Sequence, residues 1–190
     1  MSLIDPTTLG FHQLGRNVRI YSGAKIIGAE FITIGDNVII DDFVLIYAHA
    51  PTIIGSHVHI ASFCSLTGGG ELRMGDFSGL SSGVRIVTGS DDFLGGGLTN
   101  PTIPAEFRQV SRSHVHIGRH AIVGANTVVL PGTSVGDGTA VGAGSVVNRD
   151  LAPWGVYVGS PARRIRERPS AQILAQEAAL QAAHPFQCIA

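Results

Sequence analysis

An aliphatic residue returns at every sixth position through residues 117–147 of the sequence. Up to residue 141, the residue four places after each one is a threonine or a small residue, and glycine often follows the aliphatic residue directly. A fixed period of six is typical of a parallel β-helix, in which each hexad supplies one short strand and one turn, and three hexads complete a triangular coil. The aliphatic residues, which we expect to point inward, are Ile117, Val123, Val129, Val135, Val141 and Val147.

The same ladder continues upstream with longer coils. Steps of six residues are interrupted three times by a step of eight, so the early coils contain twenty residues and the later ones eighteen. The two extra residues fall near Glu30, Ala50 and Gly70, which predicts that they stack along one edge of the prism. The upstream inward positions are Leu14, Ile20, Ile26, Ile34, Ile40, Ile46, Ile54, Ile60, Leu66, Met74, Leu80 and Ile86.

At the next return to that edge the chain leaves the ladder, from Thr88 to Ser113. A long irregular excursion from a regular solenoid is usually a functional loop. We therefore expect residues 1–168 to form one all-β domain, a parallel β-helix that carries the loop 88–113.

Composition agrees with one packed domain. Of the 190 residues, 44% are hydrophobic and only 14% are charged, and the net charge of −1 gives no sign of a nucleic-acid or membrane-surface partner. No apolar run reaches the roughly 18 residues of a membrane span, and the first residues lack the features of a signal peptide. We expect a cytoplasmic protein without membrane insertion. Cys64 and Cys188 are too few for a disulfide framework, and Cys64 occupies a small inward position.

The end of the chain departs from the repeat. Residues 151–168 read as an irregular, partly extended segment that ends in the basic run Arg-Arg-Ile-Arg at 163–166. Ser170 then precedes a stretch rich in alanine and glutamine, which favours a helix from Ala171 to about Ala183 with Ser170 as its N-cap. Residues 169–190 are thus expected to form a C-terminal helix and tail.

Two segments near the end of the ladder resemble the C-terminal signature of the hexapeptide-repeat acyltransferases. They read Val-Gly-Ala-Gly-Ser-Val-Val-Asn-Arg-Asp at 141–150 and Tyr-Val-Gly-Ser-Pro-Ala-Arg at 157–163. The resemblance extends over nearly the whole chain, from about Leu14 to Arg168. It implies a left-handed β-helix that assembles as a homotrimer and uses acetyl-CoA or another acyl-CoA as donor, without a metal.

Two further segments are similar to the surface-polysaccharide branch of that family. They are Ser-Leu-Thr-Gly-Gly-Gly at 65–70, and the loop sequence from Asp-Asp-Phe at 91–93 to Asn-Pro-Thr-Ile-Pro at 100–104. This branch includes acetyltransferases that act on nucleotide-linked 4-amino-4,6-dideoxyglucose. The similarity implies a nucleotide-sugar acceptor and N-acyl transfer.

The family places its site in the grooves between neighbouring prisms, because one flat-sided prism has no pocket deep enough for a thioester, a pantetheine arm and a sugar. Matched residue by residue, Ala125, Ala143 and Asn148 lie along the path of pantetheine. Arg163 and Arg166 match basic positions that meet the CoA phosphates, for which guanidinium groups are well suited. The alternative is that both arginines belong to a solvated face before the helix.

The start of the long loop departs from the resemblance. Galactoside acetyltransferases place a histidine base after a Val-Thr-Gly turn, whereas this chain continues Val-Thr-Gly with Ser90, Asp91 and Asp92. Counting from the hexads puts Asp91 at the place of the histidine, and matching the Val-Thr-Gly text puts Ser90 there. The histidine is absent in either case.

This absence favours an amine over a hydroxyl as acceptor. A sugar hydroxyl needs a positioned base, whereas a sugar amine with a pKa near that of an α-amino group, about 7.7–8.0, can attack the thioester directly. Asp91 and Asp92 would orient such an amine. The alternative is that both cap loop turns, as aspartate often does.

The histidines leave a second function open. His49 lies on the edge that leads into the loop, where it could act as a base, and a histidine base would favour a sugar O-acetyltransferase. His116 aligns with an aromatic position beside the CoA groove of relatives. His114 and His116 alternate along the chain, so we expect one of them to face outward.

Two other classes of protein share this architecture. The γ-class carbonic anhydrases bind a metal through a His-Gly-x-x-x-His segment, which would align with Ser-Phe-Cys-Ser-Leu-Thr at 62–67, so the ligands that a zinc site requires are missing. A non-catalytic β-helix used for binding or assembly is the other alternative. The long loop and the C-terminal signature argue against it.

Overall fold

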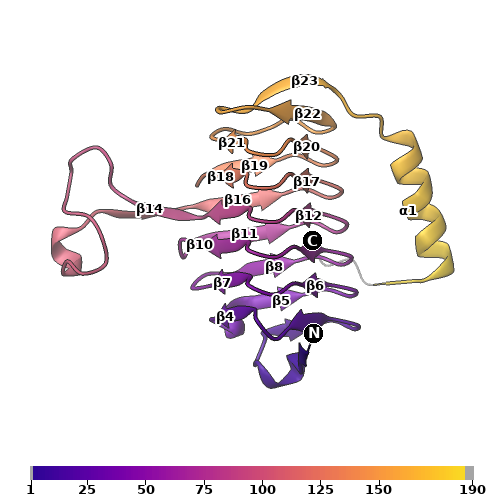
Figure 1. Ribbon diagram of the computed structural model, residues 1–190, viewed down its shortest axis with the longest axis horizontal. Coiled ribbons are helices and arrows are strands. Elements are labelled where there is room, and N and C mark those ends of the chain that lie inside the picture. Colours follow the sequence, from indigo (N-terminus) through magenta and orange to yellow (C-terminus); the bar gives the residue numbers. More distant parts are fainter. Residues whose placement is uncertain (1, 187–190) are drawn as a thin grey trace.

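The computed structural model describes residues 2–186 and is a parallel β-solenoid (Figure 1). A long loop projects from one side of it. Three sheets form the faces of the prism, and each coil visits sheet A, then sheet C, then sheet B. The β-helix expected from the hexads is confirmed, and its coils agree with the left-handed type.

The largest face is sheet A. Its nine strands lie in the order β1 (Leu3–Ile4), β3 (Arg19–Tyr21), β6 (Ile39–Ile40), β9 (His59–Ile60), β12 (Gly79–Leu80), β17 (Ile122–Val123), β20 (Ala140–Val141), β22 (Gly155–Val158) and β23 (Arg163–Glu167).

The other two faces have six strands each. Sheet C contains β4 (Lys25–Ile27), β7 (Leu45–Tyr47), β10 (Ser65–Thr67), β13 (Arg85–Val87), β18 (Val128–Val129) and β21 (Val146–Val147). Sheet B contains β2 (Gln13–Leu14), β5 (Ile32–Ile34), β8 (Thr52–Ile54), β11 (Glu71–Met74), β16 (His114–Ile117) and β19 (Thr133–Val135).

Strand register reproduces the coil lengths read from the sequence. Ile20 pairs with Ile40 and Ile40 with Ile60, twenty residues apart, whereas Val123 pairs with Val141, eighteen residues apart. These five side chains are buried. Each one stabilises the prism by about 1.5–3 kcal/mol relative to exposure, so the aliphatic column holds the coils together.

Two of the three corners carry non-glycine residues with positive φ. At the corner between sheets A and C, hereafter the A/C corner, φ is 64° at Phe43 and 65° at Phe63. At the corner between sheets B and A, the B/A corner, φ is 58° at His57, 60° at Phe77 and 57° at His120. Because each coil repeats the same turn, the side chains at a corner stack into a ladder parallel to the coil axis.

The third corner, between sheets C and B, holds the extra residues of the longer coils. The predicted stacking there is confirmed: the backbone N–H of Ala48 donates to the carbonyl oxygen of Ile27, one coil away, at 2.9 Å. A Cβ on Gly69 would lie 3.8 Å from the Cβ of His49, which occupies the same place in the preceding coil. The long loop leaves the prism from this C/B corner (Figure 1).

The loop is more regular at its base than the sequence suggests. Strands β14 (Gly89–Asp91) and β15 (Val110–Arg112) pair antiparallel into a two-stranded ribbon that projects from the prism (Figure 1). The 3₁₀ turns are η1 (Pro6–Thr8), η2 (Ala29–Phe31) and, within the loop, η3 (Ala105–Phe107). The ribbon fixes where the loop starts and therefore where its first side chains point.

The segment 151–168, expected to be irregular, extends sheet A. Strand β22 pairs parallel with β20, and the basic run forms β23, which pairs antiparallel with β22. Helix α1 (Ala171–Ala183) is confirmed at its predicted bounds, but the side chain of Ser170 makes no capping hydrogen bond. Residues 187–190, the end of the predicted tail with Cys188, lie outside the described part, whereas Cys64 is buried as expected.

Helix α1 is held against the B/A corner by polar contacts. Glu177 accepts from Nε2 of His120 at 2.7 Å and also contacts the guanidinium of Arg119, which in turn donates to the buried Asp76 at 2.6 Å. Phe186, three residues after the end of the helix, packs on the same corner, with its ring centroid 4.4 Å from that of His57. Within residues 2–186, no helix has the length and apolarity needed to cross a membrane.

Candidate functional site

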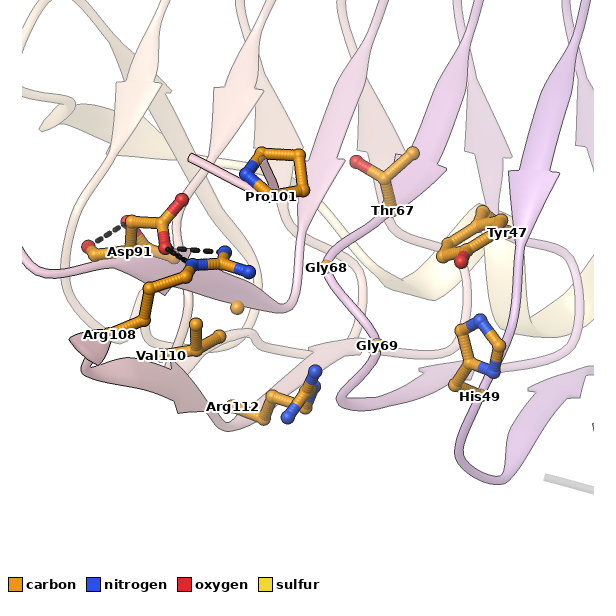
Figure 2. Close-up of a pocket in the computed structure, with 12 residues that line it drawn as sticks. Tyr47, His49, Thr67, Gly68, Gly69, Asp91, Pro101, Arg108, Val110 and Arg112 are labelled. Carbon is orange, nitrogen blue, oxygen red and sulfur yellow. Dashed lines mark hydrogen bonds and ion pairs between the residues drawn. The ribbon is translucent and has the colours of Figure 1, made fainter. Parts of the chain in front are cut away.

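A cavity of about 830 Å³ opens at the C/B corner, where the loop ribbon meets the prism (Figure 2). Its size is within the range of small-molecule sites. Strands β7 and β10 supply one wall and the ribbon β14–β15 the other. The lining residues are Tyr47, His49, Thr67, Gly68, Gly69, Gly89, Ser90, Asp91, Pro101, Arg108, Val110 and Arg112.

Asp91 is the carboxylate that the cavity contains, and it is held by an arginine. Its Oδ1 accepts from Nη2 of Arg108 at 2.6 Å and from Nε at 3.2 Å, and its Oδ2 accepts from the backbone N–H of Asn100 at 3.2 Å. The Arg108 guanidinium holds the pKa of Asp91 below its usual value, so this carboxylate stays ionised at neutral pH. Such a group can orient a cationic or amine donor but is a weak base.

Asp92 points away from the cavity and shapes the loop. Its carboxylate accepts from the backbone N–H groups of Leu94, at 2.9 Å, and of Gly96. These N–H groups lower the pKa of Asp92. Of the two aspartates predicted for the site, Asp92 therefore fits the alternative role of a loop cap, and Asp91 is the one that lines the cavity.

His49 lies on the opposite side of the cavity from Asp91, with Gly68 and Gly69 between them (Figure 2). The His49 ring packs edge-on against Tyr47, with ring centroids 4.5 Å apart. The site therefore contains the histidine that an O-acetyltransferase would need, on a wall formed by a different coil from the one that carries Asp91.

Arg108 and Arg112 are cavity residues that the sequence analysis missed. They lie at the return of the loop, twenty or more residues after its start at Thr88, and no repeat links them to the ladder. One feature of the sequence could have indicated them: the end of the loop has two arginines within five residues, in a chain with few charged residues. Together they give the cavity a positive wall beside one carboxylate.

The residues predicted for pantetheine divide between two corners. Ala125 and Ala143 occupy the A/C corner in consecutive coils, joined by a 2.8 Å bond from the N–H of Gly144 to the carbonyl of Ala125. Asn148 directly follows β21, at the C/B end of sheet C. Within one prism these residues flank sheet C and do not form one surface.

The remaining predicted donor residues lie on sheets A and B. Arg163 and Arg166 are exposed on β23, the last strand of sheet A. His116 lies on β16 of sheet B, with Nε2 3.7 Å from Glu71, and burial lowers its pKa. The expectation that only one of His114 and His116 faces outward is wrong: residues two apart on a strand share a face, and both lie on the outer side of sheet B, with rings 4.7 Å apart.

Sheet C has an apolar outer face between the two corners. In its later coils the half-buried outward side chains are aliphatic, and they are Val87, Val128, Leu130 and Val146. Exposed apolar strips of this kind are typical of interaction surfaces, although the outward Arg85 also lies on this face. Among residues 2–186, no three His, Cys, Asp or Glu residues cluster to hold a metal ion.

Comparison with known proteins gives consistent matches. A family profile described as bacterial transferase hexapeptide (six repeats) matches residues 114–149. The Escherichia coli protein named dTDP-4-amino-4,6-dideoxy-D-glucose acyltransferase is 37% identical over 161 residues, which are 84% of each chain.

Solved structures of AntD, an N-acyltransferase from Bacillus cereus, have the same fold. A variant bound to dTDP and coenzyme A is 35% identical, with a TM-score of 0.90 over 96% of this chain and 100% of that one. A second AntD structure contains dTDP and 3-hydroxybutyryl-CoA, with a TM-score of 0.86, 35% identity and coverage of 93% of this chain and 94% of that one.

Proposed function

The chain belongs to the hexapeptide-repeat acyltransferase family, and from that premise we propose that it transfers an acyl group such as acetyl from acyl-CoA to the amine of a nucleotide-linked amino-deoxy sugar. The observation that carries the proposal is the loop cavity, which contains an ionised Asp91. Counting from the hexads gives Asp91 the place of the histidine in related O-acetyltransferases. The Escherichia coli relative is named for a dTDP-linked amino sugar, and the AntD structure contains dTDP and an acyl-CoA, which agrees with this chemistry.

In the proposed reaction the neutral amine of the sugar attacks the thioester carbonyl. A carbon–nitrogen bond forms, the carbon–sulfur bond breaks, and the amine loses one proton, so that the products are an amide and the free thiol of CoA. Asp91 accepts a hydrogen bond from the amine and holds it toward the thioester. Arg108 fixes the carboxylate in place and keeps it charged.

We propose that the active assembly is a homotrimer in which sheet C of each prism faces its neighbours. Its apolar outer strip supplies the contact, and a three-fold axis brings the A/C corner of one prism to the C/B corner of the next. Ala125 and Ala143 of one subunit would then face Asn148 of its neighbour across one groove. This arrangement joins residues that a single prism separates.

A spacing in the relatives supports the same groove. The crystallised AntD variants alter one serine and one aspartate ten residues after it. In this chain Ser81 precedes Asp91, and Ser82 precedes Asp92, by ten residues. The two serines lie at the A/C corner and Asp91 at the C/B corner, so a serine and an aspartate that serve one substrate would come from adjacent subunits.

The donor and the setting complete the proposal. Arg163 and Arg166 would meet the CoA phosphates from sheet A, and His116 would lie beside the groove from sheet B of the neighbour. Acyl-CoA and nucleotide sugars are made in the cytoplasm, where we place the protein, and the product would serve surface polysaccharides such as lipopolysaccharide. The second candidate function is O-acetyl transfer, which the position of His49 in the cavity favours.

Thiol release from acetyl-CoA tests the proposal, with dTDP-4-amino-4,6-dideoxyglucose and its 4-hydroxyl counterpart as acceptors. We expect activity on the amine, with a rate that rises with pH to an inflection near or somewhat above 8 as the bound amine loses its proton. Asp91→Asn should lower kcat/KM for the acceptor without changing CoA affinity, and Asp92→Asn is its matched control. Transfer to the hydroxyl alone, an inflection near 6.5 and a loss of about 10²–10⁴-fold in His49→Ala would establish the O-acetyltransferase instead.

A further inference from the structure

Two phenyl rings at the A/C corner stack on each other in the open. Phe43 and Phe63 occupy the same turn position in consecutive coils, and their rings are 5.1 Å apart with an interplanar angle of 10°. The two residues are 62% and 59% exposed. The near-parallel planes and the one-coil spacing show that the rings stack along the coil axis.

Glycines occupy the next position of this ladder on either side. Gly23 precedes Phe43 by one coil, and Gly83 follows Phe63 by one coil. Glycine supplies no ring of its own, and the side chains that reach these two positions are short and polar, Asp42 beside Gly23 and Asn126 beside Gly83. Because most of each phenylalanine remains exposed, the outer part of each ring is accessible to other molecules. A basic residue follows each glycine by two positions, Lys25 in one case and Arg85 in the other.

The flat ring and the adjacent cation match the two parts of a nucleotide. Nη1 of Arg85 donates to the carbonyl oxygens of Phe63, at 2.6 Å, and of Gly83, at 2.8 Å, so its guanidinium is held at the turn that carries Phe63. A base stacks on an aromatic face, and a guanidinium binds phosphate. An apolar protein segment would gain nothing from this charge.

We infer that Phe63 is the platform on which the base of the acceptor nucleotide stacks, with Arg85 beside its phosphates. This inference rests on the proposed function and names a part of the site that the cavity lacks. The face toward Gly83 is preferred to the face toward Gly23, because the coil of Gly83 continues through β13 into the loop that carries Asp91.

The platform lies level with the cavity. Phe63 is next to one end of β10, and Thr67, which lines the cavity, is at the other end. The two residues are four positions apart along the chain, which spans at most about 13 Å in extended backbone. Rotation about a three-fold axis parallel to the long axis of the prism does not change a residue's position along that axis. In the proposed trimer, Phe63 of one subunit therefore comes to the cavity of the next at the same level.

The test compares ligand binding in the full-length protein with Phe63→Ala, Phe63→Tyr and Phe43→Ala. Binding of dTDP, of inorganic pyrophosphate and of CoA is measured by calorimetry, and assembly mass by light scattering. Phe63→Ala should weaken dTDP binding about 5- to 150-fold and leave pyrophosphate and CoA binding unchanged. Phe63→Tyr, which retains a flat ring, should bind dTDP like the wild type, and Phe43→Ala should change dTDP binding less than Phe63→Ala.

Three results would overturn the inference. They are unchanged dTDP affinity in Phe63→Ala, a larger loss in Phe43→Ala than in Phe63→Ala, and a loss that appears only when the assembly dissociates, which would make the rings a packing contact. The wild-type assay separates this failure from that of the proposed function. If the wild type acylates the dTDP-linked amine while Phe63→Ala binds dTDP normally, only the platform is refuted.

Discussion

Two corners of the prism each carry a ladder of stacked aromatic rings, and the two ladders have different surroundings. At the B/A corner His57, Phe77 and His120 stack at 4.9 and 5.0 Å, and Phe186 packs edge-on against the first two of these rings. At the A/C corner Phe43 and Phe63 stack in the same way without such a cover. A turn with positive φ, repeated once per coil, thus produces a ladder of flat rings.

The two ladders differ in whether another segment of the chain covers them. The B/A ladder is covered by α1 and Phe186, and Glu177 fastens the helix to Arg119 and His120. The A/C ladder has no comparable cover within residues 2–186: its neighbours are glycines, the short polar side chains of Asp42 and Asn126, and basic residues. The covered ladder should therefore contribute to stability, and the open one to binding.

The largest expected effect compares Phe77→Ala with Phe63→Ala in unfolding. Both residues are phenylalanines at nearly the same positive φ, so the backbone strain of an alanine there is the same in both variants. Phe77→Ala removes stacking with His57 and His120 and the contact with Phe186, and should cost about 2–4 kcal/mol in the free energy of unfolding. Phe63→Ala removes one exposed pair and should cost about 0.5–1.5 kcal/mol.

Denaturant unfolding followed by circular dichroism, at one fixed protein concentration, measures both values. The concentration is held constant because subunit association contributes to apparent stability. Equal losses in the two variants would abolish the distinction between a structural and a binding ladder.

Sequence reasoning predicted what the repeat controls. Coil length, the inward column from Ile20 to Val147 and the corner of departure of the loop all follow from contacts between residues one coil apart. The ladder of Phe43 and Phe63 was equally accessible, since aromatic residues recur twenty positions apart at the same turn. It was not predicted because the six-residue repeat identifies only the inward positions, and these two phenylalanines lie outside them.

The loop and the helix dock could not be predicted in this way. Asp91 meets Arg108 across seventeen residues of non-repeating chain, and Glu177 meets Arg119 across fifty-eight. Nothing in a six-residue period specifies either pairing, because each depends on how an irregular segment returns to the prism. Asp92 shows the same limit: only the folded loop reveals that backbone N–H groups occupy its carboxylate.

A smaller effect should come from mixing two impaired subunits. If Phe63 of one subunit serves the cavity that contains Asp91 of the next, a trimer of Phe63→Ala and Asp91→Asn subunits regains intact sites. In every trimer that contains both kinds of subunit, about one site in three carries both native residues. Acceptor turnover at limiting acceptor concentration should rise to about that fraction of the wild type, measured on assemblies purified through two different affinity tags.

The control is the chain that carries both substitutions, mixed with itself. A mixture no more active than its two parents would place Phe63 and Asp91 in the same subunit.

The smallest expected effect is a pH dependence confined to the covered ladder. Burial lowers the pKa of His120, and the nearby Arg119 and Arg168 lower it further, while Asp76 and Asp137 act in the opposite direction. Burial also lowers the pKa of His57.

Because both folded-state pKa values lie below that of a free histidine, the docked ladder favours neutral rings. Its stabilisation is fully present above about pH 6.5 and declines as the pH falls below that value.

Trp154, the single tryptophan, lies 6.3 Å from the His120 ring and reports on the docking of α1. Its fluorescence should change as the pH is lowered from 7 toward 5 in the wild type. It should change less when His57 and His120 are both replaced by phenylalanine, which keeps the stack and removes the titration. Phe63→Ala, a change in the open ladder, should leave this transition where it is. An identical transition in the doubly substituted protein would assign the effect to carboxylates such as Glu177, and the covered ladder would then be a purely structural element.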